Sequence, residues 1–176
     1  MIKLADKSMC CGCSACFNAC HTGALTMQAD KTGFWFPVIN NDLCVECGAC
    51  ERACPVIEKP VFDSHVPNAY IVQNLDEEIR RQSTSGGAFT GIAKQVLADG
   101  GVVFGATFNE NFKCVHTWVD KENDLIKFRN SKYVQSDIGY AYREVEKFLI
   151  AGRKVCFSGT PCQVYGLKKY LGGGYR

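Results

Sequence analysis

The chain has 176 residues, 47% of them apolar, which is enough for one domain of moderate size or for a small module followed by a larger one. Its formal net charge of +2, with basic and acidic residues interspersed, argues against a nucleic-acid-binding or membrane-surface role. No apolar run approaches the roughly 18 residues that a membrane-spanning helix needs. We therefore expect a soluble, cytoplasmic protein.

The most informative pattern is the placement of cysteine. Nine of the twelve cysteines lie in the first 54 residues, and eight of these repeat the spacing C-x2-C-x2-C-x3-C twice. Bacterial-type ferredoxins use this spacing to hold two 4Fe-4S clusters, because three consecutive thiolates reach one cubane and the fourth completes the other. The pattern predicts one cluster on Cys10, Cys13, Cys16 and Cys54, and a second on Cys20, Cys44, Cys47 and Cys50. Cluster binding should then supply much of the folding energy of residues 1–57.

Zinc and disulfide bonds are the alternatives for a cysteine-rich segment. Structural zinc sites are typically built from paired C-x2-C units, which two runs of four evenly spaced cysteines fit poorly. A disulfide framework needs an oxidising compartment, and the opening MIKLADKSMCCGC has neither a long apolar core nor a small-residue cleavage site. Iron–sulfur clusters are therefore the favoured interpretation.

The two cysteine runs are related beyond their cysteines. An offset of 34 residues superimposes 10–21 on 44–55 and matches Ala15 with Ala49 and Ala19 with Ala53. Small residues are expected where the backbone must approach a cluster closely. The pattern indicates an internal duplication.

Two positions depart from the repeat. The second run ends in Cys54-Pro55, whereas the first ends in Cys20-His21. His21 could ligate iron in place of a cysteine, but a surface histidine fits better because four thiolates are already present. Cys11 is a spare thiol beside Cys10, and its role stays open.

After the cysteine runs the composition of the sequence changes. Residues 58–68 contain Pro60 and Pro67 and predict an extended linker between a module at 1–57 and a second domain at 69–176. Hydrophobic periodicity and turn residues give the elements of the second domain. In chain order, these are a buried strand at 69–72, a helix at 76–82, a loop at 83–87, a helix at 88–98, a hairpin with strands at 102–108 and 113–119, a third antiparallel strand at 125–129, a helix at 141–149, a strand at 155–157, a loop at 158–163 and a helix at 164–170.

This second domain is mixed α/β, so the fold class of the whole chain is α+β. Two of its loops could carry chemistry. Ser85-Gly86-Gly87 opens a helix, where backbone N–H groups suit a phosphate; the alternative is that Ser85 is a plain N-cap of that helix. The loop at 158–163 follows a strand, a common cofactor position in α/β sheets.

The three cysteines of the second domain divide by position. Cys162 lies at the N-terminus of a predicted helix, a position that lowers a thiol pKa, so it could be reactive or a ligand; a buried structural cysteine is the alternative. Cys114 and Cys156 lie in predicted strands and are expected to belong to the core.

Taken together, the motifs resemble those of the family formed by the beta subunits of coenzyme F-420 hydrogenases and dehydrogenases. The tandem ferredoxin pattern is followed by S-G-G-A-F at 85–89, S-K-Y-V-Q-S at 131–136 and S-G-T-P-C-Q at 158–163. Their order and spacing match the family over essentially the whole chain. The most specific element is G-T-P-C-Q at 159–163.

The resemblance implies an iron–sulfur flavoprotein with FAD in its α/β domain. Such a protein passes electrons between the clusters and a two-electron acceptor, a deazaflavin in the archaeal enzymes and a chlorophyll derivative in a plant relative, and the flavin converts between one-electron and two-electron steps. By motif position, the flavin contacts would be Ser85, Gly86 and Gly87 near the phosphates, Lys132, Tyr133 and Gln135 at the ring or phosphates, and Gly159, Thr160 and Cys162 at the strand-end loop. Cys162 is also the candidate catalytic residue.

The sequence departs from the family at its C-terminus. Family members usually continue into a second half of the flavoprotein domain, whereas this sequence ends in L-G-G-G-Y-R at 171–176. We therefore expect an α/β domain that is incomplete at its C-terminus, with FAD assigned to the full-length family member. The cluster cysteines are unaffected.

Two classes of function follow. The first is a subunit or fragment of a flavin-dependent oxidoreductase, which works with a redox partner protein and a small-molecule electron acceptor or donor such as a deazaflavin. The second is a non-catalytic ferredoxin-type carrier that docks to a partner oxidoreductase. The strings K-Y-V-Q at 132–135 and G-T-P-C-Q at 159–163 favour the first, because a simple carrier would not need them.

Overall fold

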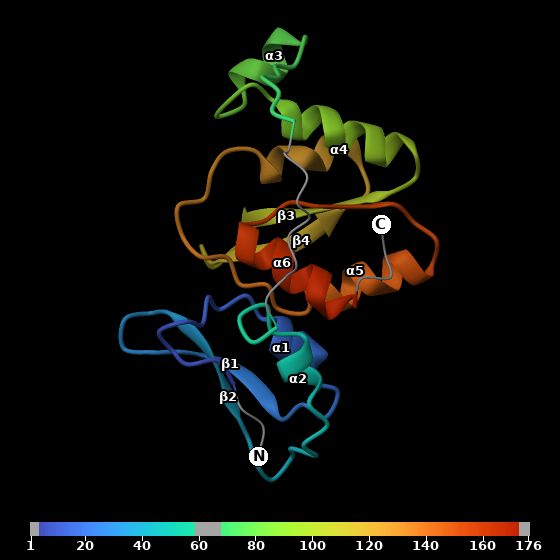
Figure 1. Cartoon of the computed structure of the whole chain (residues 1–176). Coiled ribbons are helices and arrows are strands. Elements are labelled where there is room, and N and C mark those ends of the chain that lie inside the picture. Colours follow the sequence, from blue (N-terminus) through green and yellow to red (C-terminus); the bar gives the residue numbers. More distant parts are fainter. Residues whose placement is uncertain (1–3, 59–67, 173–176) are drawn as a thin grey trace. The chain divides into compact units, whose positions relative to one another are not determined.

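The computed structural model describes residues 4–58 and 68–172 (Figure 1). The predicted linker at 58–68 lies almost wholly outside these residues, as does most of the final glycine run. Contacts divide the chain into two compact units, which do not follow chain order. The first unit comprises residues 1–61, 138–143 and 159–176, and the second comprises residues 62–137 and 144–158.

The first unit contains two short helices, a hairpin and a longer helix. Its elements are α1 (Ala15–Ala19), β1 (Leu25–Ala29), β2 (Trp35–Ile39), α2 (Ala49–Arg52) and α6 (Pro161–Tyr170). Helix α1 packs against α2, β1 and α6. The contact between α1 and α6 explains why residues 159–176 are grouped with the N-terminal segment rather than with the residues that precede them. Helix α6 begins at Pro161, three residues earlier than the periodicity predicts.

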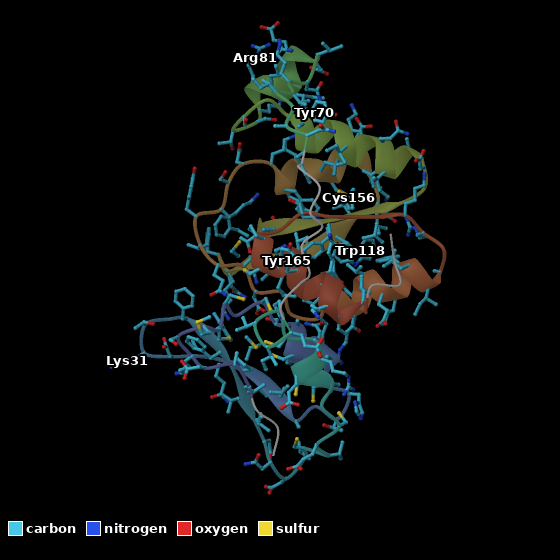
Figure 2. The ribbon with its side chains drawn as sticks, in the orientation of Figure 1. Lys31, Tyr70, Arg81, Trp118, Cys156 and Tyr165 are labelled. Carbon is cyan, nitrogen blue, oxygen red and sulfur yellow. The ribbon has the colours of Figure 1, made fainter. Side chains whose placement is uncertain are left out.

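The hairpin of β1 and β2 was not predicted. Its strands pair antiparallel from Leu25 opposite Ile39 to Ala29 opposite Trp35. The side-chain carboxylate of Asp30 organises the turn, because Oδ1 accepts hydrogen bonds from the backbone N–H of Thr32 at 2.8 Å and of Phe34 at 3.2 Å. Such an Asx turn between two apolar runs is a local hairpin signal. Figure 2 labels Lys31 in this turn.

The second unit is a three-layer arrangement around a small mixed sheet. Its elements are α3 (Glu77–Arg81), α4 (Ala88–Ala98), β3 (Val102–Phe108), β4 (Cys114–Val119), the 3₁₀ helix η1 (Glu122–Phe128), the later residues of α5 (Ala141–Ile150) and β5 (Val155–Phe157). The strand order is β4-β3-β5, with β4 antiparallel and β5 parallel to β3. Figure 1 shows α4 and η1 on one face of this sheet and α5 on the other.

Strand alternation divides the core between the two faces of the sheet. Val103 belongs to a cluster with Ala93 of α4 and with Leu125 and Phe128 of η1, and Cys156 packs against the edge of this cluster. Phe104, the next residue of β3, meets the ring of Phe148 on α5. Cys156 and Trp118, labelled in Figure 2, come from the two edge strands β5 and β4.

Most predicted elements of the second domain are confirmed. The helices near 76–82, 88–98 and 141–149, the hairpin at 102–108 and 113–119, and the strand at 155–157 are all present. Cys114 is buried, as expected for a core cysteine. The overall α+β class is confirmed as well.

The predicted third antiparallel strand at 125–129 is wrong. This segment belongs to η1, in which Leu125 and Phe128 are buried while Ile126 is 62% exposed. A spacing of three residues between buried side chains fits a 3₁₀ helix, whose residues i and i+3 eclipse, and does not fit a strand with period two. The third strand of the sheet is β5.

The predicted buried strand at 69–72 is also wrong. Residues 68–74 form no regular element, and Ile71 and Tyr70 (labelled in Figure 2) are almost fully exposed. A β-branched run forms a buried strand only where a neighbouring strand pairs with it, and no described strand does so here. The backbone N–H of Asn74 donates to the carbonyl of Gly86 at 2.6 Å, which attaches this segment to the loop before α4.

We predict that Gly105→Ala destabilises the second unit. A Cβ at this position of β3 would lie 2.8 Å from Cγ of Phe128, so the core would be overpacked. Overpacking of this kind typically costs about 1–3 kcal/mol of unfolding free energy. Urea unfolding, followed by fluorescence in a Trp35→Phe background so that Trp118 alone reports, measures the change.

Gly91→Ala is the matched control on α4. A Cβ there would meet only Nδ2 of Asn74 at 3.5 Å, an ordinary contact, and alanine favours a helix by up to about 1 kcal/mol over glycine. Its unfolding free energy should equal or exceed that of the parent. Equal stability of the two glycine variants would contradict the packing described for Phe128.

Candidate functional site

Eight cysteines of the first unit line two separate hollows. The first, of about 390 Å³, is lined by Cys10, Cys13, Cys16 and Cys54, together with Cys11 and apolar side chains. The second, of about 320 Å³, is lined by Cys20, Cys44, Cys47 and Cys50. The structure thus brings together the same two sets of four that the spacing predicts. Each set takes three cysteines from one run and one from the other.

The two cysteine loops share one unusual backbone conformation. Gly12 and Ser14 have φ of 63° and 62°, and their counterparts 34 residues later, Glu46 and Gly48, have φ of 51° and 71°. A side-chain-bearing residue rarely adopts this left-handed region, so its occurrence at Ser14 and Glu46 requires support from the surroundings. Backbone that turns in this way can point successive N–H groups into one concavity, a common arrangement at phosphate and iron–sulfur sites.

Short helices follow both loops at the same offset. Helix α1 begins at Ala15 and α2 at Ala49. Ala15 is completely buried and Ala53 is 3% exposed. Small side chains at these positions let the helices pack closely behind the cysteines. The duplication inferred from the sequence therefore extends to backbone conformation and element boundaries.

Burial makes the thiols of Cys10 and Cys16, in the first hollow, hard to ionise without a metal. Burial, together with the neighbouring thiols of Cys10 and Cys54, raises the pKa of Cys16 to about 12. Burial also raises the pKa of Cys10, against the opposing effect of the backbone N–H of Gly12. Clustered thiolates in such a place need a counter-charge, which a bound metal provides.

Cys20 has a different environment from Cys16. Partial burial acts to raise its pKa, but hydrogen bonds from the hydroxyl of Thr22 and from the backbone N–H groups of Leu25, Thr22 and Ala24 outweigh this and lower it. Donors to a cysteine sulfur tune the potential of a cluster bound to it. The neighbouring His21 is exposed, as expected for a surface histidine.

Tyr142 joins the first cysteine loop to helix α6 within the first unit. Its side chain is fully buried, and its hydroxyl lies 2.8 Å from the carbonyl oxygens of both Cys13 and Gln163. The single hydroxyl proton can be donated to either oxygen. Burial raises the pKa of Tyr142, so the group remains a donor. Gly166 of α6 completes the contact, since a Cβ there would lie 3.1 Å from Sγ of Cys13.

Arg143 caps the end of α1. Its guanidinium donates to the carbonyl of Asn18 at 2.8 Å and to that of Cys20 at 2.6 Å. Such carbonyls at a helix C-terminus lack intrahelical partners and attract a cation. Sequence reasoning missed both Tyr142 and Arg143, because no local motif marks a residue whose partners lie more than 100 positions away.

Cys162 lies beside Cys11, the spare thiol of the first run. It is the second residue of α6, and the thiols of Cys11 and Cys162 are hydrogen-bonded to one another. The hydroxyl of Thr160 lies 3.1 Å from Sγ of Cys162. The expectation of a lowered pKa for Cys162 is wrong: the contact with Cys11, followed by burial, raises it.

The flavin residues implied by the resemblance are divided between the two units. Gly159, Thr160 and Cys162 belong to the first unit, and the other six belong to the second. Ser85 is exposed, and Gly87, not the serine, is the N-cap of α4, with φ of 75° and no side-chain cap. Gly86 is required for packing, because a Cβ there would lie 2.4 Å from the carbonyl oxygen of Val72.

The loop before α4 and the K-Y-V-Q segment approach one another in the second unit. The hydroxyl of Thr84 donates to the side-chain amide oxygen of Asn130 at 3.2 Å. Lys132 donates to the carbonyls of Arg129 at 2.7 Å and Lys127 at 3.1 Å, so it caps the end of η1. Tyr133 is 91% exposed.

His116 is a buried polar group that sequence reasoning missed. Its ring lies on β4, with Nε2 3.0 Å from the carbonyl oxygen of Ser158 and Nδ1 2.9 Å from the hydroxyl of Ser136. It also stacks on Phe157 with ring centroids 5.1 Å apart. Burial lowers its pKa, although the Ser158 carbonyl and the charge of Asp137 oppose this, so the imidazole is neutral near pH 7. Because both ring nitrogens have hydrogen-bond partners, a structural role in the core accounts for His116.

Comparison with known protein families agrees with these features. Residues 9–57 match the model of a 4Fe-4S dicluster domain, and a second model of that description matches residues 36–98. Residues 69–141 match the model described as coenzyme F420 hydrogenase/dehydrogenase, beta subunit N-term. The chain thus joins a segment that matches a 4Fe-4S dicluster domain to a segment that matches the N-terminal region of coenzyme F420 hydrogenase/dehydrogenase beta subunits. The predicted resemblance to this family and the ferredoxin-type iron–sulfur character are thereby confirmed.

Among the curated relatives of this chain are three archaeal proteins. The coenzyme F420-dependent sulfite reductase of Methanocaldococcus jannaschii is 26% identical over 95% of this chain. A subunit of the F(420)H(2) dehydrogenase of Methanosarcina mazei is 24% identical over 94% of it. The chain spans 26% of the length of the first relative and 49% of the second. A polyferredoxin-like subunit of an aliphatic sulfonate oxidoreductase from Pyrococcus furiosus is 50% identical over 40 residues, or 23% of this chain and 21% of that relative.

A helix needs about 20 predominantly apolar residues to cross a bilayer. Within residues 4–58 and 68–172, no helix combines the length and apolar character needed to cross a membrane.

We predict that Tyr142→Phe destabilises the first unit. Loss of the hydroxyl leaves the carbonyls of Cys13 and Gln163 without this buried donor, at a cost of about 1–3 kcal/mol. Thermal unfolding of the metal-loaded chain under anaerobic conditions should show a lower midpoint. Tyr140→Phe is the matched control, because the Tyr140 side chain is 56% exposed and its ring contact with Phe17 survives. Equal midpoints for the two variants would contradict the role of Tyr142.

Proposed function

We propose that this chain is the electron-transfer part of a flavin-dependent oxidoreductase. One 4Fe-4S cluster would be held by Cys10, Cys13, Cys16 and Cys54, and the other by Cys20, Cys44, Cys47 and Cys50. The observation that carries the proposal is the grouping of these cysteines around two hollows, in the same sets of four that ferredoxin spacing requires.

The residues around both hollows fit such clusters. The cysteines are free thiols, the left-handed loop residues can turn backbone N–H groups inwards, and completely buried Ala15 leaves room behind the first loop. Apolar side chains, including Leu4, Met27 and Val56, complete the wall of the first hollow and would exclude water. When bound, a 4Fe-4S cluster takes up or releases one electron at a time.

The fourth cysteine of each run has a structural role in this proposal. Cys20 lies with the second run and Cys54 with the first, so each metal site would cross-link the two halves of the duplication. Such cross-links hold the two hollows in one rigid segment. Electron exchange between the clusters then needs no movement of the chain.

Two observations support including a flavin in the proposal: the resemblance to the beta-subunit family and one contact in the second unit. The Thr84–Asn130 hydrogen bond joins two positions that directly precede the segments implied in FAD binding, at 85–87 and 132–135. Free N–H groups at the start of α4, an 11-residue helix, would suit phosphate oxygens. Lys132 already donates to two carbonyls, which leaves one of its three donors for a ligand. A bound flavin would connect single-electron and two-electron transfer.

The relatives suggest the class of substrate. Coenzyme F420, a deazaflavin, appears in the names of the two long-matching relatives. We propose an organic two-electron carrier of this class as the substrate, and a separate redox subunit as the partner that receives or supplies single electrons. A non-catalytic carrier that docks to an oxidoreductase is the second candidate, favoured by the placement of all eight cluster cysteines in one compact unit.

Iron content of paired cysteine variants tests the proposed cluster assignment. The anaerobically purified parent should contain about eight irons and eight sulfides per chain. Cys10→Ala combined with Cys54→Ala removes two ligands of one cluster, so about four irons should remain. Cys10→Ala combined with Cys20→Ala damages both clusters, so few irons should remain. Cys156→Ala, in the second unit, should keep all eight.

The reversed pattern, with more iron retained by the Cys10/Cys20 pair than by the Cys10/Cys54 pair, would mean that each run holds its own cluster. Bound zinc, or about four irons in the parent, would overturn the two-cluster assignment itself. Flavin measured in the same sample separates the two candidate functions. About eight irons with flavin bound supports the flavoenzyme, whereas about eight irons with no flavin retained or bound on addition of FAD supports the carrier.

A further inference from the structure

Four of the twelve cysteines lie outside the proposed cluster sites, and two of these four meet. Cys114 and Cys156 belong to opposite edge strands of the second unit, with β3 between them. Cys11 and Cys162 are 151 positions apart in the sequence, yet their thiols are in hydrogen-bonding contact within the first unit. Both side chains are partly buried.

The structure fixes both partners of this pair. Cys11 lies on the wall of the first hollow, and its thiol also contacts that of Cys13, a proposed cluster ligand. Cys162 is held at the start of α6 by a capping box, in which Thr160 N–H donates to Oε1 of Gln163 at 2.9 Å. Tyr142 and Gly166 in turn fasten α6 to the cysteine loop. Three thiols, from Cys13 through Cys11 to Cys162, therefore form a continuous chain of sulfur contacts.

We propose that Cys11 and Cys162 are a redox-active pair that cycles between two thiols and a disulfide beside the first cluster. In the reduction, the Sγ–Sγ bond breaks, each sulfur gains one electron and one proton, and two reduced clusters each lose one electron. Solvent supplies the two protons to the partly exposed sulfurs. The reverse step oxidises the pair and returns one electron to each cluster. The inference rests on the proposed clusters but assigns a function to residues outside their ligand sets.

The chemistry of the pair suits this position. A disulfide is a two-electron couple, whereas each cluster carries one electron, so two clusters and one pair balance. The sulfurs need only approach from contact to about 2.05 Å, by movement of two side chains, to form the bond. The pair would store two electrons within the first unit, next to the one-electron relay.

Reductive titration of the anaerobic holoprotein tests the inference without an activity assay. The fully oxidised parent should take up about four electrons per chain, two for the clusters and two for the disulfide. Cys162→Ser should take up about two fewer, with its iron content unchanged. Cys156→Ser is the matched control, because Cys156 shares a tryptic peptide with Cys162, and it should match the parent. Any bound flavin takes up the same number of electrons in every sample, so the differences in electron uptake between the variants are unchanged.

Mass spectrometry identifies the bond directly. Trypsin should release residues 8–31 and 155–168, and in the Cys156→Ser background the second peptide contains only Cys162. The protein is first oxidised at a fixed potential and then alkylated while it is denatured. These samples should contain the two peptides joined by a disulfide at Cys11. Reduction of the protein should separate the peptides, and reoxidation should join them again.

The outcomes distinguish this inference from the proposed function. About eight irons, with Cys11 and Cys162 alkylated at every potential and no difference in electron uptake, would overturn the redox pair and leave the clusters intact. Loss of iron in Cys162→Ser would identify Cys162 as a cluster ligand and also overturn the pair. Absence of iron from the parent would overturn the proposed function itself and, with it, the exchange of electrons between clusters and pair.

Discussion

Eight thiols gather around two hollows in the first unit, and burial makes some of them costly to ionise. Burial and neighbouring thiols raise the pKa of Cys16 to about 12, so its thiolate form needs a strong counter-charge. A metal cluster bound there would supply that charge, and its binding would also stabilise the fold. The left-handed backbone at Ser14 and Glu46, which the chain would not adopt unaided, becomes understandable as part of the same arrangement.

The same loops also receive a segment from the far end of the sequence. Helix α6 packs against α1, and Tyr142 connects the carbonyl of Cys13 to that of Gln163. The G-T-P-C-Q string at 159–163, which is the most specific family motif, therefore belongs to the compact unit of the cysteine loops. This placement gives the motif a physical reason: its proline and capping box start the helix, and its cysteine reaches Cys11.

Local signals predicted the parts of this structure whose cause is local. Cysteine spacing indicated the two sets of four, and periodicity found α4, α5 and the β3–β4 hairpin. Most features that the sequence did not predict depend on residues far apart in the chain. Leu125 and Phe128 form a 3₁₀ helix because the core beside Val103 accepts side chains three residues apart, and Ile71 remains exposed because no described strand pairs with its segment. Tyr142, Arg143 and the partner of Cys11 depend on contacts across more than 100 residues. The β1–β2 hairpin was the exception, since Asp30 and Gly33 marked its turn locally.

We propose that two 4Fe-4S clusters occupy the two hollows of the first unit. Electron paramagnetic resonance of the dithionite-reduced chain, with spins counted against iron, tests it most directly. Two one-electron clusters held close together should give about two spins per chain, with the broadened lines of magnetically interacting centres. About one spin per chain, or two sets of narrow lines from centres that do not interact, would contradict the account.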